Sequence, residues 1–148
     1  YRRSRSGAEN IIPNSTPALN WIQSALPSVR GKMTGYALNV PVQLGSMLDI
    51  NVALSDTNVS LDEIRELFVT AASDRPRLIA TTYDPIVSSD VKTSPHSLLV
   101  DMLGCMRAGS RLYKILGWHS TLGHAHRILD VLTSYTELDN SEISEAVA

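Results

Sequence analysis

The change from a strand pattern to a helix pattern between residues 46 and 72 constrains this fold more than any other feature. In residues 46–54, SMLDINVAL, apolar side chains largely alternate, which is typical of a β-strand with one buried face. In residues 60–72, SLDEIRELFVTAA, Ser60 and Glu63 have the spacing of a capping box, and apolar side chains recur at helical intervals. This succession predicts a domain that mixes α and β structure.

Further elements carry the same signals along the chain. We predict strands at 33–41, 78–82, 86–91, 97–102 and 111–118, and a last amphipathic helix at 122–135. Strands in succession with few helices between them favour an α+β fold, with a mixed, mainly antiparallel sheet and helices packed on one face. We expect one domain over residues 1–148, with a tail at 137–148 that frays because it is acidic and lacks a large apolar cluster.

The stretch ENIIPNSTPALN, residues 9–20, predicts a helix that begins near Pro17 and ends near Leu26. Ser15 or Thr16 can occupy the N-cap, and Pro17 suits the first helical position because it has no N–H to satisfy. A helix N-terminus beside free hydroxyls is also a plausible phosphate site. Capping is the commoner use of these residues, and both interpretations stay open on this evidence.

Composition and charge exclude several classes of protein. A formal charge of −2 gives no electrostatic case for nucleic acid or an anionic membrane, and no apolar run approaches the roughly 20 residues of a membrane helix. One cysteine, Cys105, excludes an intrachain disulfide and suits a reducing, cytoplasmic compartment. We expect it in a turn-like segment, LGCMRAGS, as a structural or surface thiol. Because the chain begins with Tyr1 instead of Met, we expect a fragment or a processed product.

Five separated motifs point to a known family. They are RRSRSGAENIIPNST, GKMTGYALNVPV, DPIVSSDV, PHS and a late GW followed by an arginine. In this order and at near-constant spacing, they resemble the C-terminal half of glyceraldehyde-3-phosphate dehydrogenase. The corresponding family patterns are RRARAAxxNIIPTSTGAAK, GKLxGxAxRVPV, DPIVSSD, PHS and WYDNEWGYSNR. The resemblance spans roughly residues 2–135.

The resemblance implies a large mixed sheet with helices on one face, beside a separate Rossmann domain that binds NAD or NADP. Family enzymes are usually homotetramers, so it implies a homo-oligomer and either a missing Rossmann half or a companion chain as partner. The family reaction uses a cysteine nucleophile and a histidine base, both of which precede the segment that matches YRRSRS. On this basis the chain alone supplies no catalytic residue and binds no cofactor by itself.

The resemblance assigns a weakened phosphate site to the first forty residues. Arg3 matches an arginine that helps to bind phosphate, and Thr16 matches the threonine of the STG turn. Pro17 replaces the following glycine and removes one N–H donor. Asn39 replaces the arginine of AxRVPV, and a charged hydrogen bond lost from such a site is worth about 1.5–3 kcal/mol.

The cofactor side is also altered, since the family segment WYDNEWGYSNR becomes WHSTLGHAHR, one residue shorter. Thr121 falls approximately where a family asparagine contacts the nicotinamide amide, and His124 falls near the family tyrosine. His119, His124 and His126 lie close together, but no carboxylate or thiol completes a metal site, so we expect surface or capping roles and no metal.

Three hypotheses about function follow. The chain is the C-terminal domain of a divergent dehydrogenase that uses another aldehyde, and its N-terminal half supplies the NAD site, the cysteine and the histidine. Alternatively, it is a non-catalytic binding or structural protein that reuses the fold for oligomerisation or docking, as the replacements at Pro17, Asn39 and Thr121 suggest. An independent enzyme of 148 residues is the least favoured, because no nucleophile and base pair is evident.

Overall fold

The computed structural model describes the backbone of residues 2–147 and the side chains of residue 2 and residues 4–138. The chain forms two compact units, residues 1–43 and residues 44–148. The expectation of one domain over 1–148 therefore stays a prediction. No helix in the described part is long and apolar enough to cross a lipid bilayer.

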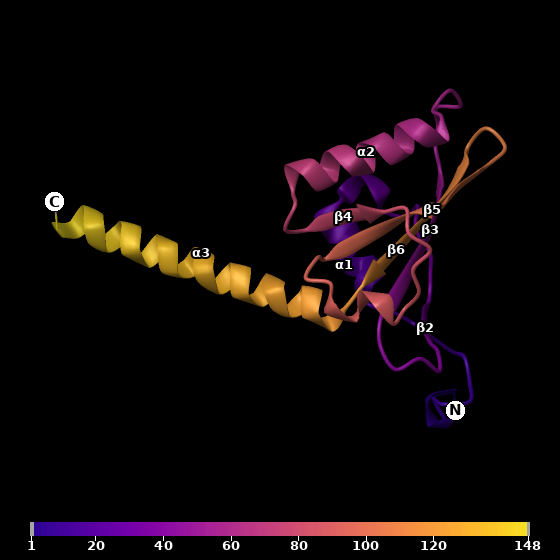
Figure 1. The fold of residues 1–148 in the computed structure, drawn as a ribbon, viewed down its shortest axis with the longest axis horizontal. Helices are drawn as coiled ribbons and strands as arrows, with labels where there is room; N and C mark the ends of the chain where they lie inside the picture. Colours follow the sequence, from indigo (N-terminus) through magenta and orange to yellow (C-terminus); the bar gives the residue numbers. More distant parts are fainter. Residues whose placement is uncertain (1, 148) are drawn as a thin grey trace. The chain divides into compact units, whose positions relative to one another are not determined.

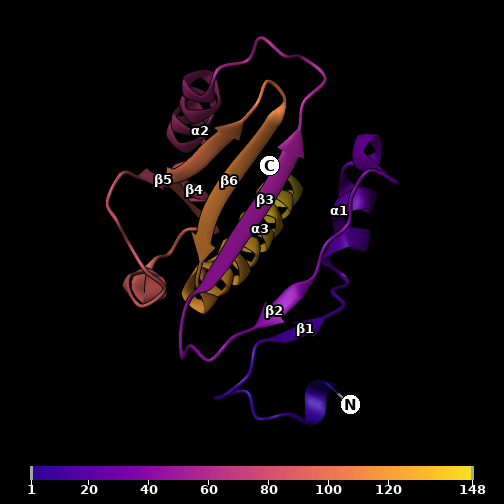
Figure 2. The same cartoon turned by 90° about the vertical axis from the view of Figure 1, so that its right-hand side faces the viewer.

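The first unit contains a two-stranded antiparallel sheet and a short helix (Figure 2). Its strands are β1 (Ile12–Asn14) and β2 (Ala37–Asn39), and α1 spans Ala18–Ala25. Two single 3-10 turns, η1 (Arg2–Ser4) and η2 (Pro27–Val29), complete it. The strand predicted at 33–41 is shorter than expected, and β1 lies in a stretch for which no strand was predicted.

The second unit is built on a four-stranded sheet of order β3-β6-β5-β4, in which only the β4–β5 pair is parallel (Figure 2). Its helices are α2 and α3, of which α3 extends away from the strands (Figure 1). The bounds are β3 (Ser46–Ala53), α2 (Leu61–Asp74), β4 (Ile79–Thr82), η3 (Asp90–Thr93), β5 (Leu98–Ala108), β6 (Leu112–His119) and α3 (Thr121–Val147). This mainly antiparallel arrangement confirms the α+β class.

The core of the second unit lies between α2 and the β4–β5 side of the sheet (Figure 1). Val100, Met102 and Cys105 of β5 are fully buried, and Leu61 and Phe68 of α2 pack against them. Leu61 and Phe68 are seven positions apart, and this helical spacing turns both toward the sheet. The helical period of residues 60–72 therefore accounts for the α2 side of this core, whereas β3, for which the alternation of residues 46–54 predicted a buried face, is almost wholly exposed.

The predicted strand at 86–91 is wrong. This segment is a turn that leads into η3, because polar groups satisfy the backbone locally. The Ile86 N–H donates to the Asp84 carbonyl at 2.9 Å, and the Val87 N–H donates to the Asp90 carboxylate at 2.8 Å. Local hydrogen bonds of this kind compete with strand pairing, and Pro85 has no N–H to give to a ladder.

The expected turn around Cys105 is also wrong, because β5 continues to Ala108 instead of ending at Met102. A register shift between Asp101 and Met106 accommodates the extra residues as a bulge. Cys105 is 1% exposed and its thiol donates to the Asp101 carbonyl at 3.3 Å. Of the two roles expected for it, the structural one is confirmed and the surface one is wrong.

The last helix, α3, begins one residue before the predicted segment and continues well past its predicted end at 135. Its described apolar side chains are largely exposed, including Leu129, Leu132 and Tyr135. The prediction that the tail 137–148 frays falls mostly on side chains outside the described residues, and it stays a prediction.

Candidate functional site

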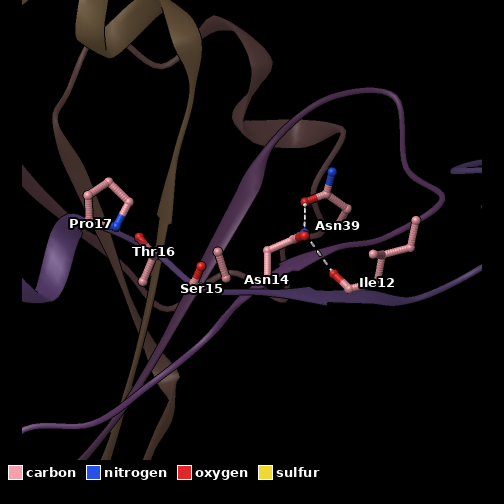
Figure 3. A pocket seen from close by; sticks show the side chains of 7 residues that line it. Ile12, Asn14, Ser15, Thr16, Pro17 and Asn39 are labelled. Carbon is pink, nitrogen blue, oxygen red and sulfur yellow. Dashed lines mark hydrogen bonds between the residues drawn. The ribbon is translucent and has the colours of Figure 1, made fainter. Parts of the chain in front are cut away.

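A hollow of about 510 Å³ opens at the β1–β2 pair and the start of α1 (Figure 3). We call it the β1–β2 hollow. Its lining residues are Ile12, Asn14, Ser15, Thr16, Pro17, Ala37 and Asn39. Ile12 is buried, whereas the polar lining residues are half-buried or exposed. The described lining is therefore partly polar and accessible to solvent.

The path of the chain from β1 into α1 brings Thr16 and Pro17 to this hollow. Pro17 occupies the N-cap with φ −72°, so the helix begins at Ala18, one residue later than predicted. The Thr16 hydroxyl accepts the Ala18 N–H at 3.2 Å, and the Pro17 carbonyl accepts the Asn20 N–H at 3.0 Å. Pro17 suits this position because its fixed φ matches the observed backbone. The prediction that Ser15 or Thr16 occupies the N-cap is therefore wrong: Pro17 takes that position without a side-chain cap, and the Thr16 hydroxyl closes a local turn just before it.

Asn14 and Asn39 join the two strands across the hollow. Asn14 pairs with Ala37 in the register, so Asn39 is its diagonal neighbour on the same face of the sheet. The Asn14 amide nitrogen donates to Asn39 Oδ1 at 2.9 Å and to the Ile12 carbonyl at 3.0 Å (Figure 3). These two bonds tie the side chain of Asn39 to β1.

The described lining is electrically neutral, since it consists of amides, hydroxyls and apolar groups. It includes three of the residues chosen from the sequence, Thr16, Pro17 and Asn39. The side chain of Arg3, the fourth, lies outside the described residues. Asn14 was missed, although a signal existed: it stands where the family pattern NIIPTST has a threonine.

The remaining predicted positions, Thr121 and His124, belong to the second unit. Both are exposed on the first turn of α3, and no described hydrogen bond joins their side chains. The sequence reasoning missed Ser120, which is 5% exposed, donates to the Ser94 carbonyl at 2.8 Å and accepts the Gly123 N–H at 3.2 Å. Over the described residues, no group of three or more His, Cys, Asp or Glu side chains gathers as metal ligands would.

Comparisons with known proteins agree with the motifs. The sequence model of the family described as "Glyceraldehyde 3-phosphate dehydrogenase, C-terminal domain" matches residues 1–121. Glyceraldehyde-3-phosphate dehydrogenase of Mycobacterium tuberculosis (strain ATCC 25618 / H37Rv) is 42% identical over 134 residues, 89% of this chain and 39% of the relative. The enzyme of Borreliella burgdorferi is 39% identical over 134 residues, 88% of this chain and 40% of the relative. The chain thus spans about two fifths of the length of these relatives, and it belongs to the glyceraldehyde-3-phosphate dehydrogenase family, whose C-terminal domain it represents.

Proposed function

We propose that this chain is the substrate-binding part of a longer dehydrogenase that oxidises an aldehyde with NAD or NADP and phosphorylates the product. The observation that carries the proposal is the family match over residues 1–121. The chain matches only about two fifths of the length of its relatives. The N-terminal part supplies the cofactor domain, the cysteine nucleophile and the histidine base. Residues 1–43 contribute the β1–β2 hollow to the substrate side.

The burial of Cys105 supports the proposal that the nucleophile lies in the N-terminal part. A thiol must be accessible and ionised to attack an aldehyde. Cys105 is 1% exposed and its thiol donates to a backbone carbonyl, so an aldehyde cannot reach it. The nucleophile of the proposed reaction therefore comes from another part of the protein.

The proposed cofactor is bound mainly outside this chain. Thr121 offers one exposed hydroxyl at the start of α3, which suits a hydrogen bond to a carboxamide but does not make a dinucleotide site. NAD or NADP supplies the hydride acceptor when it is bound. We assign to this chain only the orientation of one end of the cofactor.

We also propose a homo-oligomeric, cytoplasmic protein, with the tetramer as the family's usual state. Apolar side chains on β3 and α3 are exposed, among them Met47, Leu129 and Leu132. Surfaces of this kind are commonly covered in an assembly. The N-terminal part and further copies of the chain are the proposed partners.

The experiment that tests the proposal begins with the intact mass of the native polypeptide that contains this sequence. We expect a mass well above 16.2 kDa, and reduction of NAD or NADP by that polypeptide with an aldehyde and inorganic phosphate. The 148-residue chain, assayed in parallel, serves as the control. A native polypeptide of 16.2 kDa would overturn the proposal.

A second candidate is a non-catalytic binding or structural protein that keeps this fold for oligomerisation or docking. The Asn14–Asn39 bridge favours it, because a neutral pair occupies the place of the family's phosphate-binding arginine. The same assay separates the two candidates. A long polypeptide that binds partners but reduces neither cofactor would support the second.

A further inference from the structure

The described residues that line the β1–β2 hollow are all neutral, and this indicates a class of ligand. We propose that this hollow binds an uncharged, hydroxyl-bearing part of a ligand instead of a phosphate group. The groups that would hold it are the amide of Asn39 and the hydroxyls of Ser15 and Thr16. The inference rests on the proposed function only where it takes the ligand to be the aldehyde substrate.

The hydrogen bonds of Asn14 fix the orientation of Asn39. The Ile12 carbonyl can only accept, so the Asn14 atom that contacts it at 3.0 Å is the amide nitrogen. The same nitrogen donates to Asn39 at 2.9 Å, which identifies the Asn39 atom there as its oxygen. A flipped Asn39 would place two N–H groups against each other. Its own Nδ2 therefore points away from Asn14 (Figure 3), which leaves its two N–H groups for the proposed ligand.

The neighbouring hydroxyls extend this set of neutral groups. Thr16 Oγ1 accepts the Ala18 N–H, which leaves its O–H to donate. Ser15 is exposed beside it and can donate or accept. Pro17 has no N–H, so the first backbone donor of this turn is missing. The recess thus combines neutral donors and acceptors, which is the mixture that a hydroxyl or carbonyl group requires.

The free energy of desolvation favours an uncharged ligand here. A phosphate that enters the recess loses strong hydration, and charge-assisted hydrogen bonds are what normally restore it. The described lining provides neutral donors, whose hydrogen bonds are about half as strong as charge-assisted ones. A hydroxyl group loses less hydration, so the same neutral bonds suffice for it.

The direct test is a titration of the isotopically labelled 148-residue chain, followed by the side-chain amide signals of Asn14 and Asn39. D-Glyceraldehyde and inorganic phosphate are the two probes, added separately at equal ionic strength. We expect saturable shifts with D-glyceraldehyde and at least about 10-fold weaker binding of phosphate, equivalent to about 1.4 kcal/mol. Equal or tighter binding of phosphate would overturn the proposal, and so would the absence of a saturable response to D-glyceraldehyde.

Two variants of Asn39 make the test specific. Asn39→Asp keeps an acceptor for Asn14 but removes the Nδ2 donors, so the response to D-glyceraldehyde should be lost. Asn39→Arg introduces a cation and should tighten phosphate binding about 10-fold. Asn58→Asp makes the same charge change at an exposed position among residues 44–148 and should leave both responses unchanged. A full response in a folded Asn39→Asp variant would refute the role of Asn39.

The outcome is separable from that of the proposed function, because the titration requires no turnover. Selective binding of D-glyceraldehyde by a protein that reduces no cofactor would uphold this inference and remove the dehydrogenase proposal. An active dehydrogenase whose β1–β2 hollow binds phosphate selectively would do the reverse.

Discussion

Asp101 shows how one side chain stabilises an irregular part of the sheet. Asp101 is only 6% exposed, and both of its carboxylate oxygens accept hydrogen bonds. Oδ1 accepts the Gly104 N–H at 2.9 Å, and Oδ2 accepts the Trp118 indole N–H at 3.2 Å. The first bond closes the bulge of β5, and the second joins β5 to β6. A buried polar group that satisfies two donors is costly to remove.

Replacing Asp101 should therefore destabilise the protein, and the loss should be larger when no acceptor oxygen remains. Asp101→Ala leaves both donors without their acceptor and should lower the free energy of unfolding by about 2–4 kcal/mol. Asp101→Asn keeps one acceptor oxygen and should cost about half as much. Urea denaturation followed by circular dichroism measures both. An Ala variant as stable as the wild type would show that the carboxylate contributes nothing to the bulge.

Gly123 is required by a close approach of backbone segments. A Cβ at this position would lie 2.1 Å from the His96 carbonyl oxygen, which belongs to backbone and cannot move aside. Helix propensity alone predicts that Gly123→Ala stabilises α3 by up to about 1 kcal/mol. The contact predicts the opposite sign, a loss of about 1–3 kcal/mol.

The matched control for Gly123 is Ala125→Gly, at an exposed position in the same part of α3. It should cost about 1 kcal/mol through propensity alone. Thermal unfolding of the two variants distinguishes the effects, and a more stable Gly123→Ala variant would contradict the close approach.

At the scale of elements, α2 is specified by its own first turn. The Ser60 hydroxyl accepts the Glu63 N–H at 3.1 Å, and the Glu63 carboxylate accepts the Ser60 N–H at 2.6 Å. This is the capping box predicted from the sequence. The hydrogen bond from the Ser60 backbone N–H holds the pKa of Glu63 below its ordinary value, and the Ser60 side chain contributes a smaller lowering. The helix start thus contributes a pH-dependent part of the stability.

The direction of this dependence follows from the lowered pKa. Because the folded pKa lies below the unfolded one, the stabilisation is complete above the unfolded pKa and is lost as the pH falls through the folded pKa. Glu63→Gln keeps an acceptor but does not ionise, so it should remove this component from a stability-against-pH curve. Ser60→Ala should cost about 1 kcal/mol at neutral pH. Identical acid profiles of wild type and Glu63→Gln would exclude the linkage.

At the scale of the whole molecule, buried side chains are unevenly distributed along the described chain. Among the described side chains of residues 2–43, only that of Ile12 is buried, whereas residues 44–138 contain the Val100–Met102–Cys105 core. Residues 40–44 connect the two units and are exposed. Local opening is expected first where few apolar contacts hold the backbone.

Limited proteolysis tests this unevenness. Thermolysin cleaves before large apolar residues, so we expect its first cut before Leu44, which is 54% exposed in the connection. Leu48 is the matched comparison, since it is 41% exposed but lies in β3, paired with β6. A fragment that begins at residue 44 should accumulate and be identified by mass. An earlier cut within β3 or β5 would contradict the two-unit description.

The sequence predicted the elements whose determinants are local. The period of residues 46–54 and the Ser60–Glu63 spacing predicted β3 and α2 closely, because alternation and capping act within a few residues. The motifs also identified the family and three residues of the β1–β2 hollow. The strand expected at 86–91 failed because Asp84 and Asp90 satisfy its backbone locally.

The α+β class, the family and the α2 cap were predictable from the sequence, since these depend on periodicity, ordered motifs and neighbouring residues. The continuation of β5 through a bulge with Cys105 buried, and the contact between Asn14 and Asn39, became visible only in the folded chain. The reason is physical: both features require partners distant in sequence, the Trp118 indole in one case and the facing strand 25 residues away in the other. Pairing across such separations leaves no periodic signal in the chain, although it determines which described side chains meet at the hollow.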